Sequence, residues 1–250
     1  MPIWDKWEKY STLIKNKELE KHLPETTRFS TEKELWDFVY RYPSVILKPI
    51  DGSRGRKIFK VSEVESDKFE IHYLNSREVF IGRNYAYSYF KNKKAPRRTY
   101  LAQRYISLAN IQGCPFDIRV IVQKQKNSNN WIVTGKAAKL AGQGFFVTNN
   151  NNQLRSGSIL PVAEAIKASN IHKVDDNGEK LVSELERIAL LATKTLEPIY
   201  QGHPIYGFDM GIDSDGHIWI IEANLNPGLS YFLKLADKTM YYTIKKMRKR

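Results

Sequence analysis

Cysteine is almost absent from this sequence of 250 residues, which contains Cys114 alone. A single cysteine excludes an intramolecular disulfide framework and a cysteine-rich zinc site, and it is typical of a reducing compartment. The five histidines are scattered and show no metal-binding spacing. No apolar run approaches membrane-spanning length, and the N-terminus lacks the apolar segment of a signal peptide. These absences predict a soluble cytoplasmic protein.

Acidic residues are also in short supply, with 27 Asp and Glu against 40 Lys and Arg, a formal net charge of +13. Such an excess points to an anionic partner, which can be a nucleic acid, a nucleotide, a phosphate-rich surface or an acidic peptide. Charge alone does not choose among these. The hydrophobic share of 42% and the charged share of 27% are those of a globular protein and exclude a wholly disordered chain. The length allows one or two domains with a sizeable core.

Strand and helix patterns alternate in blocks, which indicates an α+β fold. A capping box at Thr31 and Glu34 opens an early helix. The other predicted elements are a strand at 44–49, an antiparallel pair at 116–123 and 131–140, an amphipathic helix at 179–197, a hairpin of 205–212 with 217–223, and a basic helix at 231–250.

The C-terminal hairpin carries the sharpest chemical signal. If its turn is tight, Asp209 lies opposite Ile220, Glu222 is its diagonal neighbour on the same face, and Asn224 continues that face. Carboxylates in an apolar setting are costly unless compensated, and Mg²⁺ binds one or two carboxylates together with substrate phosphates. We therefore expect Asp209, Glu222 and Asn224 to bind a metal. A bulge in the turn would change the register, and the alternative is that Asp209 caps a turn while Glu222 is exposed.

Two weaker signals concern phosphate. Lys48 ends a buried strand and is followed by a glycine-bearing loop at 51–56, whose backbone N–H groups can approach phosphates closely. The loop lacks the Walker A order, and a hairpin turn with a solvated lysine is an equal alternative. Asp117 and Arg119 share one face of a strand, and an arginine fixed in this way suits a transferring phosphoryl group. A surface charge pair is the alternative.

Taken together, the order of these segments resembles the ATP-grasp superfamily, and the closest likeness is to its YheC/YheD branch, the endospore coat-associated ATP-grasp proteins. The resemblance covers nearly the whole chain. The segments that carry the superfamily likeness are Asp5-Lys6-Trp7, Leu47-Lys48-Pro49 with its loop, 101–106, 116–120, Phe208-Asp209 and 221–228. Those that look like the branch are 5–10, 23–26, 52–56 and 131–135.

The resemblance implies a fold of two α+β lobes, residues 1–106 and 107–250, with ATP between them and without most of the usual leading domain. It assigns roles to groups of residues. Those implied near the nucleotide are Lys6 and Lys48 at the phosphates, Gly52, Ser53, Arg54 and Gly55 in a lid loop, and Gln103, Arg104, Tyr105 and Ile106 at a hinge beside adenine. The residues that the resemblance implies as Mg²⁺ ligands are Asp209, Glu222 and Asn224. The residues that it implies beside the γ-phosphate and the developing acyl phosphate are Arg119 and Lys139. Lys139 stands where relatives often have arginine, and Gln103 stands where many have an acidic residue.

The implied function is an ATP- and Mg²⁺-dependent carboxylate–amine (or thiol) ligase. Much of the charge lies at 91–98 and 245–250, and an absent leading domain leaves one side of the cleft open. We therefore expect an acidic peptide or protein acceptor, and by resemblance a spore-associated location. The alternatives are a grasp-fold kinase, a nucleotide-binding coat scaffold without turnover, and a basic nucleic-acid-binding module. The acidic hairpin argues against the last of these, because a nucleic-acid binder has no need of buried carboxylates.

Overall fold

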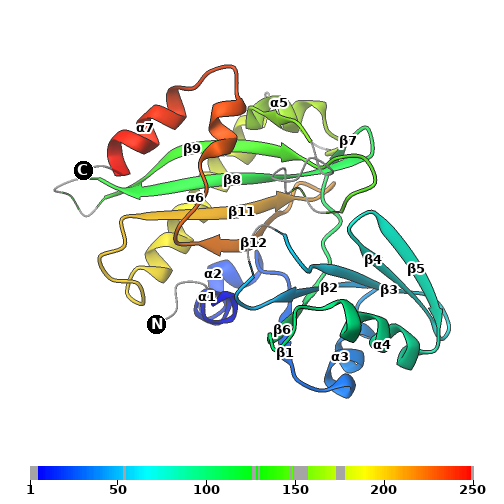
Figure 1. Ribbon diagram of the computed structural model, residues 1–250. Helices are drawn as coiled ribbons and strands as arrows, with labels where there is room; N and C mark the ends of the chain where they lie inside the picture. Colours follow the sequence, from blue (N-terminus) through cyan, green and yellow to red (C-terminus); the bar gives the residue numbers. More distant parts are fainter. Residues whose placement is uncertain are drawn as a thin grey trace. The chain divides into compact units, whose positions relative to one another are not determined.

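The computed structural model describes residues 5–52, 55–125, 128, 130–146, 148, 157–172 and 178–248. The chain forms two compact units, each of which contains helices and an antiparallel sheet (Figure 1). The small unit comprises Pro24–Ile106 with residues 5–7, and the large unit comprises Ser107–Arg250 with Glu8–Leu23. The predicted α+β class is confirmed. The assignment of residues 1–106 and 107–250 to two functional lobes stays a prediction.

The small unit is a sheet with two helices packed against it. In spatial order its strands are β1 (Thr26–Phe29), β6 (Tyr100–Arg104), β2 (Ser44–Pro49), β3 (Phe59–Glu65), β4 (Lys68–Tyr73) and β5 (Ser76–Ile81). The helices are α3 (Glu32–Val39) and α4 (Arg83–Lys93). The predicted capping box opens α3, with both reciprocal hydrogen bonds of Thr31 and Glu34 present. Aromatic side chains such as Phe59, Phe69 and Phe90 fill the core between sheet and helices.

The large unit is built on a second sheet. Its strands, in spatial order, are β10 (Ile159–Leu160), β9 (Trp131–Leu140), β8 (Cys114–Lys124), β11 (Ile205–Ile212) and β12 (Ile218–Asn224), with β7 (Asn110–Ile111) paired to β8. Its helical segments are α1 (Lys6–Leu13), whose first two residues belong to the small unit, α2 (Lys17–Glu20), α5 (Val162–Ala168), α6 (Glu179–Leu196), the 3₁₀ helix η3 (Ser230–Lys234) and α7 (Thr239–Arg248). Among the described residues, no helix is long and apolar enough to cross a membrane.

The two faces of the large sheet are covered differently. Strand alternation directs Ile118 and Val120 of β8 into the main core, which they share with α6. On the opposite face Ile121 packs against Phe232 of η3 and Ile244 of α7. Both elements lie on that side of the sheet in Figure 1. The same alternation that directs Ile118 and Val120 into the core places Asp117 and Arg119 on this second face.

The C-terminal segment corrects one prediction. Instead of a continuous helix from residue 231, the chain forms η3, leaves the helical conformation at Leu235, and starts α7 at Thr239. Leu235 is buried against the sheet, and the carboxylate of Asp237 accepts a hydrogen bond of 2.8 Å from the backbone of Thr239. Packing of Leu235 and local capping by Asp237 therefore win over helix propensity. Residues 249 and 250 lie outside the described residues.

Two glycines next to the end of β12 give a matched test of packing. A Cβ at Gly207 would lie 2.4 Å from Cβ of Pro227, whereas one at Gly228 would meet no atom within 4 Å. We expect Gly207→Ala to lower the free energy of unfolding by about 1–3 kcal/mol, because Pro227 must move. Gly228→Ala should change it by less than about 0.5 kcal/mol. Urea denaturation of both variants measures this, and equal midpoints would contradict the close contact at Gly207.

Candidate active site

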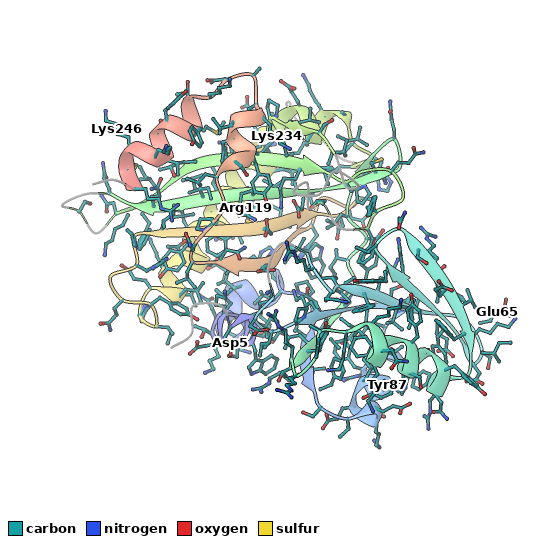
Figure 2. The ribbon with its side chains drawn as sticks, in the orientation of Figure 1. Asp5, Glu65, Tyr87, Arg119, Lys234 and Lys246 are labelled. Atoms are coloured by element: carbon teal, nitrogen blue, oxygen red, sulfur yellow. The ribbon has the colours of Figure 1, made fainter. Side chains whose placement is uncertain are left out.

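Four charged side chains meet on the large sheet's second face. They are Asp117 and Arg119 on β8, Lys139 on β9 and Asp209 on β11, and we call them the charge cluster. The strand register pairs Asp117 with Lys139 and Arg119 with Asp209. Figure 2 labels Arg119 on its strand. Only 5–14% of each of these side chains is exposed, so the cluster is a buried ionic network.

Asp209 is the centre of the charge cluster. Arg119 donates to both of its carboxylate oxygens, from Nε at 2.9 Å and from Nη2 at 3.0 Å. Lys139 Nζ donates to Oδ1 at 2.8 Å, and the amide of Asn224 donates to Oδ2 at 3.2 Å. Burial alone would raise the pKa of Asp209, but Arg119 and Lys139 outweigh it and hold that pKa well below its ordinary value. Asp209 is therefore ionised throughout the neutral range.

Lys139 connects the two carboxylates. Its Nζ lies 2.9 Å from Oδ1 of Asp117 as well as 2.8 Å from Asp209, and the hydroxyl of Thr148 donates to Asp117. Burial would lower the pKa of Lys139, but the two carboxylates raise it above the ordinary value. Burial raises the pKa of Asp117, and the attraction of Lys139 offsets this only in part. Lys139 is therefore charged, and Asp117 is the easier of the two carboxylates to protonate.

An aromatic ring lies against both cations. The ring centroid of Tyr231, the second residue of η3, is 5.3 Å from Arg119 Cζ and 5.3 Å from Lys139 Nζ. Tyr231 is buried, with 7% exposed, so this cation–π contact is shielded from water. Sequence reasoning did not assign Tyr231 to the site. A tyrosine inside a predicted helix gives no signal of this contact, which depends on the break after η3.

The predicted metal ligands are brought together, but in a different register from the one expected. Asp209 lies directly opposite Glu222 and not Ile220. The register differs because a β-bulge follows Asp209 and because the turn is one residue longer than expected. Cross-strand neighbours share a face, so Glu222 still belongs beside Asp209. Asn224 contacts Asp209 through its amide. Together they offer two carboxylates and an amide oxygen, a donor set that suits Mg²⁺.

Within the part of the chain that the structure describes, no group of three or more His, Cys, Asp or Glu side chains is placed to hold a metal ion. The hairpin set has only two carboxylates, so phosphate or water oxygens must complete the coordination of Mg²⁺. The role of these three residues as metal ligands stays a prediction.

In the small unit, two of the predicted nucleotide-binding residues contact each other. Lys48 on β2 donates from Nζ to Oε1 of Gln103 on β6 at 2.8 Å, and Gln103 donates from Nε2 to the hydroxyl of Thr26 at 2.9 Å. Lys48 and Gln103 are 5% and 6% exposed. A lysine this buried is not solvated, so the alternative of a hairpin turn with a solvated lysine is excluded.

Lys6 and the glycine loop also lie together in the small unit. The backbone N–H of Lys6 donates to the carbonyl of Ile50 at 3.0 Å, and its Nζ donates to the carbonyl of Gly52. A Cβ at Gly52 would lie 2.3 Å from Cγ of Pro49, and Gly55 has a φ of +62°. Both positions therefore favour glycine. Ser53 and Arg54, predicted for the same loop, lie outside the described residues.

The predicted hinge residues lie at the end of β6 and directly after it. Arg104 pairs with the carboxylate of Glu25 at 3.2 Å near the surface, and the backbone of Tyr105 donates to the carbonyl of Ser44 at 3.0 Å. Lys60 lies 4.0 Å from the ring centroid of Tyr105, and burial raises the pKa of that tyrosine. Ile106 is half-buried. Their contact with adenine stays a prediction.

Comparison with known proteins identifies the class of this fold. VanG D-Ala:D-Ser ligase from Enterococcus faecalis superposes with a TM-score of 0.60, over 98% of this chain and 61% of that chain, at 15% sequence identity. An identity this low shows the fold alone, which is the one found in ATP-grasp ligases. The chain belongs to the YheC/D-like ATP-grasp family, whose match covers residues 1–248.

Two curated relatives support this membership. Endospore coat-associated protein YheD of Bacillus subtilis (strain 168) is 27% identical over 238 residues, which are 92% of this chain and 49% of YheD. Endospore coat-associated protein YheC of the same strain is 23% identical over 250 residues, 96% of this chain and 64% of YheC. The chain therefore spans about half the length of YheD and under two thirds of that of YheC. The predicted resemblance is confirmed.

Proposed function

We propose that the protein is an ATP- and Mg²⁺-dependent carboxylate–amine ligase that acts through an acyl phosphate. The observation that carries this proposal is the contact of Arg119 and Lys139 with Asp209, next to Asn224. Family membership supports ATP-grasp chemistry, and the similar fold of a ligase agrees with it. By extension from the two relatives, whose names record association with the endospore coat, we also propose a spore-associated location.

The reaction balances in two steps. A carboxylate oxygen of the substrate attacks the γ-phosphorus of ATP, the bond to the β–γ bridging oxygen breaks, and ADP leaves. The acyl phosphate formed is then attacked at its carbonyl carbon by an amine, which loses a proton as inorganic phosphate departs. Negative charge concentrates on phosphoryl oxygens in the first step and on the carbonyl oxygen and departing phosphate in the second, so fixed positive groups lower both barriers.

Arg119 and Lys139 would supply that positive charge. Arg119 donates two hydrogen bonds to Asp209 and lies against Tyr231, so its guanidinium plane has little freedom. Lys139 is held between Asp117 and Asp209. Cations that are oriented before the reaction need no reorganisation when charge develops, and in a buried site they act more strongly than in water.

The oxygen donors of Asp209, Glu222 and Asn224 would hold Mg²⁺. When bound, Mg²⁺ would neutralise phosphate charge and make the γ-phosphorus more electrophilic. The low pKa of Asp209 keeps its carboxylate ionised at any neutral pH, and Mg²⁺ would share its oxygens with Arg119 and Lys139. In the small unit, Lys48 and Lys6 would contact the phosphates, the loop at 52–55 would cover them, and the residues at 103–106 would bind adenine.

Lys48 and Arg119 should affect different kinetic parameters. We expect Lys48→Ala to weaken MgATP binding about tenfold or more, because a charge-assisted contact present in the ground state is lost. Arg119→Ala should lower kcat about 10²–10³-fold with a smaller change in affinity, because Arg119 acts on charge that develops during transfer. Calorimetric titration with MgATP and initial rates of ADP release separate the two. Equal losses of affinity in both variants, with no separate rate effect, would refute this division of roles.

Hydroxylamine tests the reaction class. Acyl phosphates react with it to give hydroxamates, so a ligase incubated with ATP, Mg²⁺, a glutamate-rich peptide and hydroxylamine should release ADP and form a peptide hydroxamate in equal amounts. ADP release with a stable phosphopeptide and no hydroxamate would indicate a kinase. Nucleotide binding without ADP release would indicate a scaffold, and RNA binding without any ATPase activity would indicate a nucleic-acid-binding module.

A further inference from the structure

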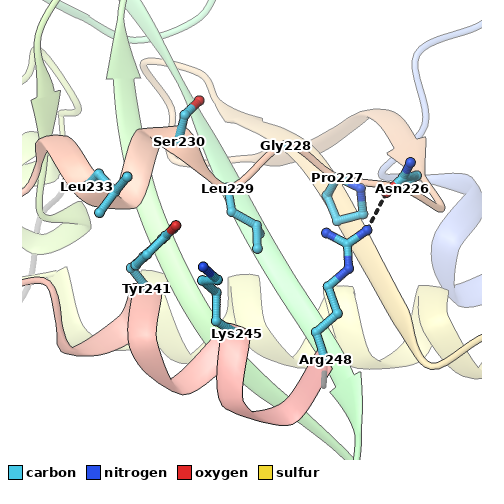
Figure 3. Close-up of a pocket in the computed structure, with 9 residues that line it drawn as sticks. All are labelled: Asn226, Pro227, Gly228, Leu229, Ser230, Leu233, Tyr241, Lys245 and Arg248. Carbon is cyan, nitrogen blue, oxygen red and sulfur yellow. Dashed lines mark hydrogen bonds between the residues drawn. The ribbon is translucent and has the colours of Figure 1, made fainter. Parts of the chain in front are cut away.

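A pocket of about 680 Å³ opens on the large unit between α7 and the loop that follows β12 (Figure 3). Its lining combines loop residues with one face of η3 and α7: Asn226, Pro227, Gly228, Leu229, Ser230, Leu233, Tyr241, Lys245 and Arg248. A Cβ at Gly228 would meet nothing within 4 Å, which shows how open the space beside the loop is. The charge cluster does not line this pocket.

The loop of the pocket is joined to the charge cluster at both ends. Two residues before Asn226, Asn224 donates its amide to Asp209. Directly after Ser230, the ring of Tyr231 lies 5.3 Å from both Arg119 and Lys139. Because consecutive Cα atoms are 3.8 Å apart, Cα of Asn226 lies within about 8 Å of Cα of Asn224. The pocket is therefore next to the proposed reaction site.

Two cations give the pocket its charge. Lys245 and Arg248 stand one turn apart on α7, so they share a face of that helix. Arg248 donates from Nη2 to Oδ1 of Asn226 at 2.6 Å, which fastens the guanidinium to the loop, and Lys245 Nζ lies 5.3 Å from the ring centroid of Tyr241. Among the described residues, no carboxylate pairs with either cation, and no Asp or Glu lines the pocket.

Most of the remaining lining is apolar, apart from Asn226 and Ser230. Leu229, Leu233 and Tyr241 contribute aliphatic and aromatic surface beside the two cations. This combination suits a side chain that has a methylene stem and ends in an anion. Nucleic acid fits it less well, because nucleic-acid-binding sites use an extended row of cations and several rings for base stacking. Here there is one ring and one pair of cations.

We propose that this pocket binds a carboxylate side chain of an acidic peptide acceptor, with Lys245 and Arg248 as its anion contacts. This inference rests on the proposed ligase function and adds to it the site that holds the acceptor. A peptide anchored here by one carboxylate reaches the charge cluster with a group a few residues away. The net charge of +13 favours the same partner, since it attracts acidic chains from a distance.

Direct binding of fluorescein-labelled hexaglutamate, measured by anisotropy without ATP, tests the proposal. We expect Lys245→Ala/Arg248→Ala to weaken binding about tenfold, as for the loss of two charge-assisted contacts. Lys234→Ala/Lys246→Ala is the matched control, because it removes the same charge from η3 and α7 at positions outside the pocket lining (Figure 2). It should weaken binding less than about threefold. Gly228→Leu, which fills the pocket without a change in charge, should weaken binding as the pocket variant does.

Failure of wild-type protein to bind hexaglutamate, or equal losses in the two double variants, would overturn the pocket assignment. A labelled RNA hexamer that binds more tightly and is lost in the same pocket variant would overturn it in favour of nucleic acid. The ligase function is read separately on the same samples through MgATP binding and hydroxamate formation. Loss of peptide binding with normal MgATP binding thus refutes the pocket alone, while pocket-dependent binding without ADP release supports the pocket and refutes ligation.

Discussion

Asp209→Asn is expected to lower the free energy of unfolding by about 3–5 kcal/mol and to abolish ATP turnover. The variant keeps the shape of the side chain, but it leaves Arg119, which is 6% exposed, without its carboxylate partner. Lys139 keeps its ion pair with Asp117 at 2.9 Å, so Arg119 is the cation that mainly loses its partner. Urea denaturation and ADP release measure the two effects. A stability loss below about 1 kcal/mol would mean that the cluster contributes no more than a surface ion pair.

A double-mutant cycle separates the pair from its surroundings. Arg119→Met/Asp209→Asn removes both charges, so it should cost less than the sum of the single variants. Asp215→Asn serves as the control, because Asp215 lies in the turn of the same hairpin with 85% of its side chain exposed. Additive losses within the cycle would contradict direct coupling of Arg119 and Asp209.

The free energy of unfolding that Asp209→Asn loses should become smaller as the pH falls. The folded pKa of Asp209 is depressed, so its contribution is complete above about pH 5 and is lost as the pH falls through the unfolded value near 3.9 toward the folded one. The difference in free energy of unfolding between wild type and Asp209→Asn should be constant from about pH 5 to 8 and become smaller below about pH 4. Asp117, whose pKa is raised, acts with the opposite sign but is present in both proteins. A stability difference that increases at acidic pH would contradict the lowered pKa of Asp209.

Glu222→Gln is expected to reduce turnover about a thousandfold or more while the fold stays intact, because the change removes the charge that we assign to the metal without altering shape. Glu222 lies opposite Asp209 and is half-buried, so its substitution leaves the main core untouched. ADP release with Mg²⁺ and hexaglutamate, together with thermal unfolding, measures both effects. Asp215→Asn on the same hairpin should retain activity. Full ATP consumption by Glu222→Gln would show that the metal assignment is wrong.

Local patterns in the sequence predicted the elements of the fold well. The strand expected at 44–49 is β2, and the amphipathic helix expected at 179–197 is α6 to within one residue. The capping box at Thr31 is present as expected. Each signal lies within a few consecutive residues, through apolar periodicity or a capping residue. The prediction of one basic helix at 231–250 was wrong because the burial of Leu235, a tertiary contact, interrupts the helix.

The site was predictable only where its residues are close in the chain. Asp209 and Asn224 belong to one hairpin, so alternation together with the expected tight turn predicted that they share a face. The contacts of Arg119 and Lys139 with Asp209 depend on the register between β8, β9 and β11, which no local pattern determines. The bulge after Asp209 escaped prediction for the same reason, although it brings Glu222 directly opposite Asp209.

The central claim is that Asp209, Glu222 and Asn224 bind the divalent ion that accompanies the nucleotide. Mn²⁺ reports on such a site by electron paramagnetic resonance, and a nonhydrolysable ATP analogue prevents turnover during the titration. Wild type and Asp215→Asn should bind Mn²⁺ tightly only when the analogue is present, and Glu222→Gln should bind it at least about tenfold more weakly while retaining its fold. Equal Mn²⁺ affinity in Glu222→Gln and wild type, with the analogue bound to both, would contradict the account.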